Sequence, residues 1–86
     1  MLHIEDTELG ELPLPDGLIV PRIRMTTSGL PETQIMVGDQ EYQYERSIPI
    51  KGHSATLPEA ILGLLAESKK PLVLERPDRF YVYVAK

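Results

Sequence analysis

Residues 56–70 carry signals for both the start and the end of a helix. Thr56-Leu57-Pro58-Glu59 matches a capping box, in which the Thr56 hydroxyl accepts a bond from a free amide and Glu59 reaches back. Pro58 is tolerated there because the first turn of a helix does not need its missing N–H. Pro71 prevents the helix from continuing. The sequence therefore predicts one helix at 56–70, and the rest of the fold must be built around it.

The apolar residues of this segment recur at helical spacing and form one stripe, which consists of Leu57, Ala60, Ile61, Leu64 and Leu65. A helix of about thirteen residues is marginal on its own, and Gly63 costs it about 1 kcal/mol relative to alanine. Burying four large apolar side chains contributes roughly 6–12 kcal/mol, so we expect the helix to form because it docks on a sheet. Leu62 falls off the stripe and is a candidate contact with a second surface.

Strand patterns occupy residues 18–50. The first predicted strand, 18–27, contains Pro21, which cannot donate to a ladder and so predicts an edge position or a bulge. A second strand is predicted at 33–37, and Gly38-Asp39 is a two-residue hairpin signal. The returning strand, 41–50, alternates, with one face made by Tyr42, Tyr44, Arg46, Ile48 and Ile50.

The segment 71–86 is predicted to be a C-terminal hairpin with Arg76-Pro77-Asp78-Arg79 as its turn. Phe80, Val82 and Val84 share one face of its second strand and supply a core face. Tyr81 and Tyr83 share the opposite face, so we expect this tyrosine pair to be exposed.

Residues 1–17 contain five acidic side chains and no basic one. Gly10, Pro13 and Pro15 break any helix, and we expect an acidic, extended, polyproline-like lead-in, with a short edge strand at 1–4. The charge of the whole chain is −4, and an acidic chain with nine basic residues disfavours non-specific nucleic-acid binding.

These elements predict one α+β domain over residues 1–86, with a small antiparallel sheet or half-open barrel. The expected order is about β-β-β-α-β-β, with one helix packed on the sheet. With 86 residues and no cysteine, the chain has to rely on one compact core or on a partner. The start, Met1-Leu2-His3-Ile4, is not a signal peptide, and no apolar run approaches a membrane span. We expect a cytoplasmic location and no membrane association.

No catalytic constellation stands out. The two histidines, His3 and His53, are fifty residues apart, and Ser54 beside His53 is not a base–nucleophile pair. A metal at His3 with Glu5 or Asp6 would need a third ligand from elsewhere. We therefore expect no enzyme, no metal and no cofactor.

The segment that precedes the helix gathers the chemistry of an anion site. Lys51, Gly52, His53, Ser54 and Thr56 bring together free amides, hydroxyls, a lysine and a titratable ring at a helix N-terminus. The P-loop pattern is absent, and the alternative is an ordinary strand-to-helix turn. A small-anion or phosphate-binding domain is one of the functions left open.

The two Tyr-x-Tyr pairs, Tyr42/Tyr44 and Tyr81/Tyr83, are the main candidate binding residues. Exposed tyrosines anchor protein interfaces or stack on single-stranded nucleic acid, and the acidic charge favours a protein. The first hypothesis is thus a non-enzymatic interaction module that binds a protein partner or a second copy through these tyrosines, with Leu62 as a further contact. The alternative for either pair is a core position.

Two stretches resemble known families. Ser54–Ile61 resembles the strand-to-helix opening of a CBS half-domain, although the following strand, second helix and tandem copy are absent. Leu57–Val84 is similar to the N-terminal domain of Phd/YefM-type antitoxins. That resemblance implies a regulatory, DNA-associated dimer as an alternative function. The toxin-neutralising tail that such antitoxins carry has no counterpart before Lys86.

Overall fold

The computed structural model describes residues 2–15, 17–27, 29, 32–50 and 56–86. Within these ranges the strands are β1 (Leu2–Ile4), β2 (Gly10–Pro13), β3 (Ile19–Arg24), β4 (Gln34–Val37), β5 (Gln40–Pro49), β6 (Pro71–Glu75) and β7 (Arg79–Ala85). A 3-10 turn, η1 (Asp6–Glu8), lies between β1 and β2, and the helix α1 (Thr56–Ala66) lies between β5 and β6. The radius of gyration, 12.0 Å, is that of a compact chain of this length.

All seven strands belong to one sheet, in the order β1-β4-β5-β7-β6-β3-β2. The prediction of an antiparallel sheet is wrong in detail, because β1 pairs with β4, and β3 with β6, in parallel. The other neighbouring pairs are antiparallel. A curled half-barrel with one helix, and thus a broadly α+β fold, is confirmed.

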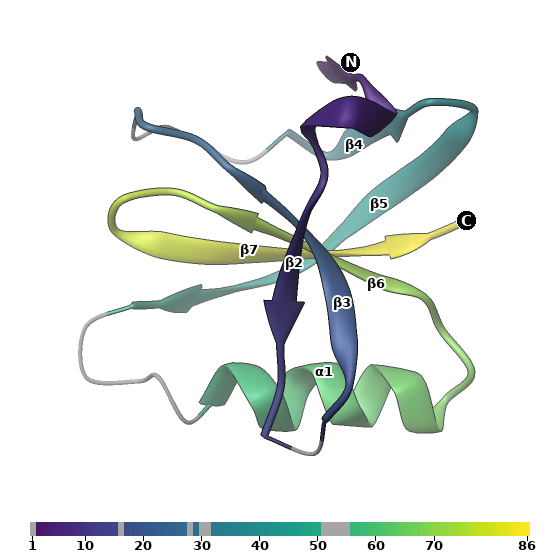
Figure 1. Cartoon of the computed structure of the whole chain (residues 1–86), viewed down its shortest axis with the longest axis vertical. Coiled ribbons are helices and arrows are strands. Elements are labelled where there is room, and N and C mark those ends of the chain that lie inside the picture. The colour runs from purple at the N-terminus through teal and green to yellow at the C-terminus, as the bar shows by residue number, and fades with distance from the viewer. Residues whose placement is uncertain (1, 16, 28, 30–31, 51–55) are drawn as a thin grey trace.

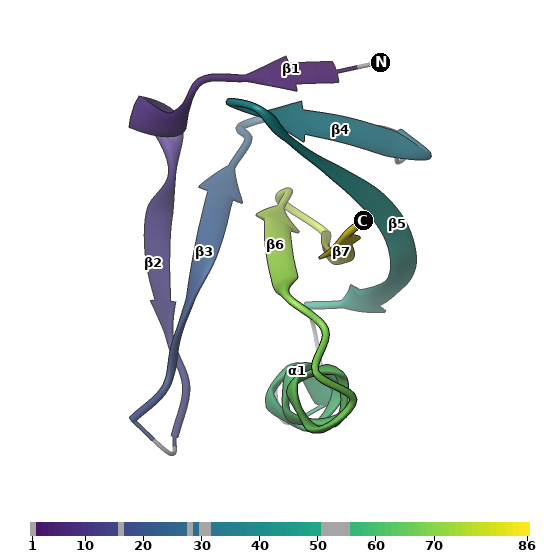
Figure 2. The same ribbon diagram turned by 90° about the vertical axis from the view of Figure 1, so that its right-hand side faces the viewer.

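Because the sheet curls, other elements pack on both faces of the β6–β7 hairpin. Figure 2 shows β1, β4 and β5 folded over one side of this hairpin, with α1 on the other side. One buried cluster, here called the tyrosine core, contains Ile4, Ile23, Ile35, Val37, Leu72, Leu74, Tyr81 and Tyr83. The second, here called the helix core, contains Leu14, Val20, Ile48, Leu57, Ile61, Leu64, Val73 and Val82.

The helix forms for the predicted reason but ends earlier than 70. Leu57, Ile61 and Leu64 are buried in the helix core, and Ala60 and Leu65 pack against it, which confirms the stripe. After Ala66 the Ser68 N–H donates to the Leu65 carbonyl (3.0 Å) and the Lys69 N–H to the Leu64 carbonyl (3.0 Å). This is a Schellman ending, with Ser68 in the left-handed conformation at φ 63°.

A bulge in β5 overturns the continuous alternation predicted for residues 41–50. Tyr44 faces Tyr83 across the ladder, but Arg46 faces Val82, so Glu45 is the extra residue. Tyr42 and Tyr44 therefore pack against the tyrosine core, whereas Ile48, beyond the bulge, is buried in the helix core. Because the bulge reverses the direction in which alternate side chains point, residues of this one strand contribute to both cores.

The lead-in predicted for residues 5–17 is a 3-10 turn and a strand instead. β1 is a terminal strand of the sheet, as expected, but β2 is the other terminal strand, paired with β3. Pro21 is therefore not on an edge, since β3 lies between β2 and β6. Its missing N–H is tolerated because the ladder to β6 begins only at Arg22.

Candidate interaction surface

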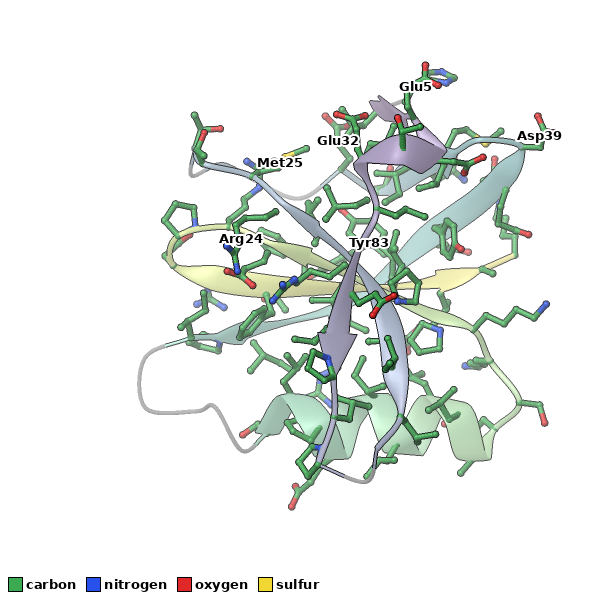
Figure 3. All side chains as sticks on the ribbon, viewed as in Figure 1. Glu5, Arg24, Met25, Glu32, Asp39 and Tyr83 are labelled. Carbon is green, nitrogen blue, oxygen red and sulfur yellow. The ribbon has the colours of Figure 1, made fainter. Side chains whose placement is uncertain are left out.

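Tyr81 and Tyr83 are core residues, so the prediction that they are exposed is wrong. Their exposed fractions are 4% and 0%. Phe80, Val82 and Val84 do lie on the helix side, as expected. The opposite face is covered as well, because β4 and β5 curl back over it. Figure 3 places Tyr83 near the centre of the molecule, with Glu5 and Asp39 at its periphery.

The phenol groups of this pair hold the connection between β3 and β4. Tyr81 Oη donates to the Gly29 carbonyl (2.9 Å), and Tyr83 Oη donates to the Glu32 carbonyl (2.8 Å). Arg76 Nη1 donates to the Thr27 carbonyl (2.8 Å). All three donors come from the β6–β7 hairpin. Their hydrogen bonds therefore hold the β3–β4 connection against this hairpin.

The other tyrosine pair is half-buried beside them. The Tyr44 ring meets the rings of Tyr81 and Tyr83 edge-on, with centroids 6.2 and 5.7 Å apart. Burial raises the pKa of Tyr83 to about 12, while nearby Arg76 opposes that rise. Burial, and then the Asp6 carboxylate, raise the pKa of Tyr42. The four tyrosines are thus brought together, but inside the fold.

The remaining predicted site residues are not gathered around these tyrosines. Leu62 is half-buried on α1 and belongs to neither core cluster. Thr56 is the first residue of α1. Lys51, Gly52, His53 and Ser54 lie outside the described residues, so the anion-site hypothesis stays a prediction.

A sheet face on the β2–β3 ribbon is exposed instead. Residues that face each other across an antiparallel ladder share a face, and the pairs here are Glu11 with Pro21 and Pro13 with Ile19. Glu11, Pro13 and Ile19 are exposed, and Pro21 is half-buried. We call these four residues the open ribbon face. Leu18, at the turn end of the ribbon, is exposed on the opposite side.

The ribbon is held in place by its other face. Leu14 and Val20 are buried in the helix core, and Leu12 packs against it. Figure 1 shows β2 and β3 crossing in front of α1, with their turn at the level of the helix. Toward the opposite end of β3, Ile23 is buried in the tyrosine core. Buried side chains therefore hold the ribbon near its turn, through the helix core, and at the far end of β3, through the tyrosine core.

Two prolines fix how the ribbon backbone is oriented. Pro13 and Pro21 have no N–H, so the hydrogen-bonded pairs of this ladder are Gly10–Arg22 and Leu12–Val20. The Leu14 N–H, which donates to the Leu18 carbonyl at 2.7 Å, continues this pattern. Glu11 and Pro13 consequently turn their backbone groups outward. The outer edge of β2 offers one N–H, that of Glu11, and is poorly suited to adding a strand.

Sequence reasoning missed this surface although a signal for it exists. Asp16-Gly17 is a hairpin dipeptide, and Pro13 and Pro21 flank it at positions four before and four after Gly17. Gly17 adopts a φ of +81°, as a turn of this kind requires. The strand at 18–27 was predicted, but treating Pro13 as a breaker alone hid β2 and with it the ribbon.

Among the described residues there is no grouping of three metal-ligating side chains and no pocket. In the same part of the chain no helix has the length and apolarity needed to cross a membrane. No protein-family model, curated protein or solved structure is similar enough to this chain to count as a match.

Proposed function

We propose that this chain is a small, non-enzymatic protein-interaction module whose partner docks on the open ribbon face. One observation carries the proposal. Leu18 and Ile19 are the large apolar side chains left exposed among the described residues, with exposed fractions of 42% and 59%. They are neighbours at the turn end of the ribbon, where Ile19 belongs to the open ribbon face and Leu18 projects from the opposite side.

The composition of this face supports binding through side chains. Pro13, Ile19 and Pro21 present apolar surface, and Glu11 supplies a charge at its border. An apolar centre with a polar rim is the usual anatomy of a protein–protein interface. The ribbon is anchored by Leu14 and Val20, so little ordering has to accompany binding.

A capture experiment with matched variants tests the proposal. The tagged full-length chain is incubated with native lysate, with and without nuclease, and bound material is identified by mass spectrometry. The double variant Leu18→Ser/Ile19→Ser removes both exposed apolar side chains at the turn end of the ribbon. Leu62→Ser is the matched control on α1, and circular dichroism checks that each variant folds.

We expect one stoichiometric protein that the wild-type chain and the Leu62→Ser variant retain and the double variant loses. Retention by the double variant, or no captured protein at all, would overturn the proposal. Material that is nucleic acid, or that disappears on nuclease treatment, would also overturn it. That outcome would favour the DNA-associated alternative instead.

A further inference from the structure

The open ribbon face lies in an acidic part of the molecule. Glu11 is part of the face, and Asp6 and Glu8 are exposed in η1, which leads directly into β2. The first seventeen residues contain no lysine or arginine. A partner that approaches this face therefore meets apolar side chains bordered by carboxylates.

Four basic residues of the described chain pair with other carboxylates. Arg22 Nη1 and Arg24 Nε both pair with Glu75, at 3.4 and 3.3 Å. Lys69 and Lys86 pair with Glu67 and Glu41. Within the part of the chain that the structure describes, no ion pair involves Asp6, Glu8 or Glu11. Glu8 Oε2 accepts the Glu5 N–H at 2.9 Å, so Glu11, which is on the face itself, offers its charge to a partner.

A second copy of this chain fits the face poorly. In a two-fold symmetric contact the same patch lies on both sides of the interface. Each copy would then bring its own Glu8 and Glu11 to the contact, and like charges across an interface cost free energy. The blunted edge of β2 also denies two copies a shared ladder, because Pro13 has no N–H to donate.

We infer that the open ribbon face takes a segment of another protein in which lysine or arginine stands beside a large apolar side chain. The apolar side chain packs against Ile19 and Pro13, and the basic group pairs with Glu11. This inference rests on the proposed function and names the chemistry of its partner.

Short synthetic peptides and the full-length chain provide the test. The first peptide alternates lysine with leucine, the second replaces each lysine by glutamate, and the third replaces each leucine by serine. Amide NMR shifts are followed during each titration. We expect the first peptide alone to shift Glu11, Leu18 and Ile19, and to do so less at high salt.

Charge reversal at the face supplies the matched comparison. Glu11→Lys should weaken binding of the first peptide by about fivefold, as expected when a rim ion pair is lost. Glu59→Lys, which reverses an exposed charge on α1, should leave the affinity unchanged. Equal weakening by both variants would mean a non-specific charge effect and would overturn the inference.

Three other outcomes would also overturn it: equal binding of the glutamate peptide, shifts that map away from the face, or a dimer in sedimentation that Ile19→Ser abolishes. The capture experiment separates this failure from failure of the proposed function. A captured protein that Leu18→Ser/Ile19→Ser loses, but that Glu11→Lys and salt do not affect, would leave the interaction module intact and remove the basic partner.

Discussion

The β6–β7 hairpin and the β2–β3 ribbon are both antiparallel pairs, yet they differ in how many faces are covered. The hairpin lies in the middle of the sheet and contributes residues to both the tyrosine core and the helix core. In the part of the ribbon next to its turn, one face is covered by the helix core and the opposite face is exposed. Alternation along a strand tells which residues share a face, whereas elements distant in sequence decide whether that face is covered.

A matched pair of leucines gives the largest expected effect. Leu74 in β6 is 1% exposed and Leu18 beside β3 is 42% exposed. Leu74→Ala should lower the free energy of unfolding by about 2–5 kcal/mol, because it leaves a cavity in the tyrosine core. Leu18→Ala should change it by no more than about 0.5 kcal/mol.

Urea unfolding followed by circular dichroism measures both leucine variants. Similar losses would mean that the turn end of the ribbon is covered in solution, and the contrast between the two regions would fail. Oligomeric state is the control, because a partner copy on the ribbon would also protect Leu18.

Two turn glycines extend the comparison to the backbone. Gly38, between β4 and β5, has a φ of +58°, and a Cβ there would lie 2.6 Å from the carboxylate oxygens of Asp6. Gly17 in the ribbon turn has a φ of +81° with nothing within 4 Å. Gly38→Ala should lower the free energy of unfolding by about 2–3 kcal/mol and Gly17→Ala by about 1 kcal/mol. The second loss is smaller because only the left-handed backbone conformation disfavours alanine there.

Removing the Asp6 carboxylate tests why the two glycine substitutions differ. The double variant Gly38→Ala/Asp6→Ala should recover part of the loss, whereas Asp6→Ala should not help Gly17→Ala. Equal losses for the two single variants in thermal unfolding would show that Asp6 moves aside freely.

Alkaline pH should lower the free energy of unfolding through Tyr83 in the β6–β7 hairpin. The pKa of Tyr83 is raised from 10.0 to about 12, mainly by burial, so the folded state keeps this proton more tightly than the unfolded state. The stabilisation is complete below pH 10 and is lost as the pH rises from 10 through 12. The loss should be on the order of 2 kcal/mol.

Denaturant unfolding at a series of pH values, with ultraviolet titration of the tyrosinate band, measures this effect. Tyr83→Phe starts from lower stability because the hydrogen bond to Glu32 is gone, but it should lack the Tyr83 contribution to the alkaline loss. An unchanged pH profile in that variant would assign the loss to other tyrosines.

Local signals in the sequence predicted the elements that local chemistry determines. The apolar stripe located α1, and Gly38-Asp39 located the β4–β5 hairpin, because each signal acts within a few residues. The parallel pairing of β3 with β6 joins segments about fifty residues apart, and no local pattern encodes it. The bulge at Glu45 is also invisible to an alternation that assumes one residue per step.

The candidate site was misplaced for a related reason. The alternation along the last strand correctly predicts a core face for Phe80, Val82 and Val84, and it predicts solvent exposure for the tyrosines between them. That step assumes a sheet with one covered face. In a sheet that curls back on itself a central strand is buried on both faces, so Tyr81 and Tyr83 become core and the exposed face moves outward to the ribbon.

The smallest effect is a gain in stability on the covered side of the molecule. Ser68 adopts a left-handed φ of 63° at the end of α1, a conformation that disfavours a residue with a Cβ. Ser68→Gly should therefore raise the free energy of unfolding by about 0.5–1 kcal/mol, while Gly17→Ser in the ribbon turn, with a φ of +81°, should lower it by a similar amount. Because both positions lie outside the two cores, the pair compares backbone strain alone between the regions. A loss on Ser68→Gly in urea unfolding would show that the Ser68 side chain contributes more to the Schellman ending than its strain costs.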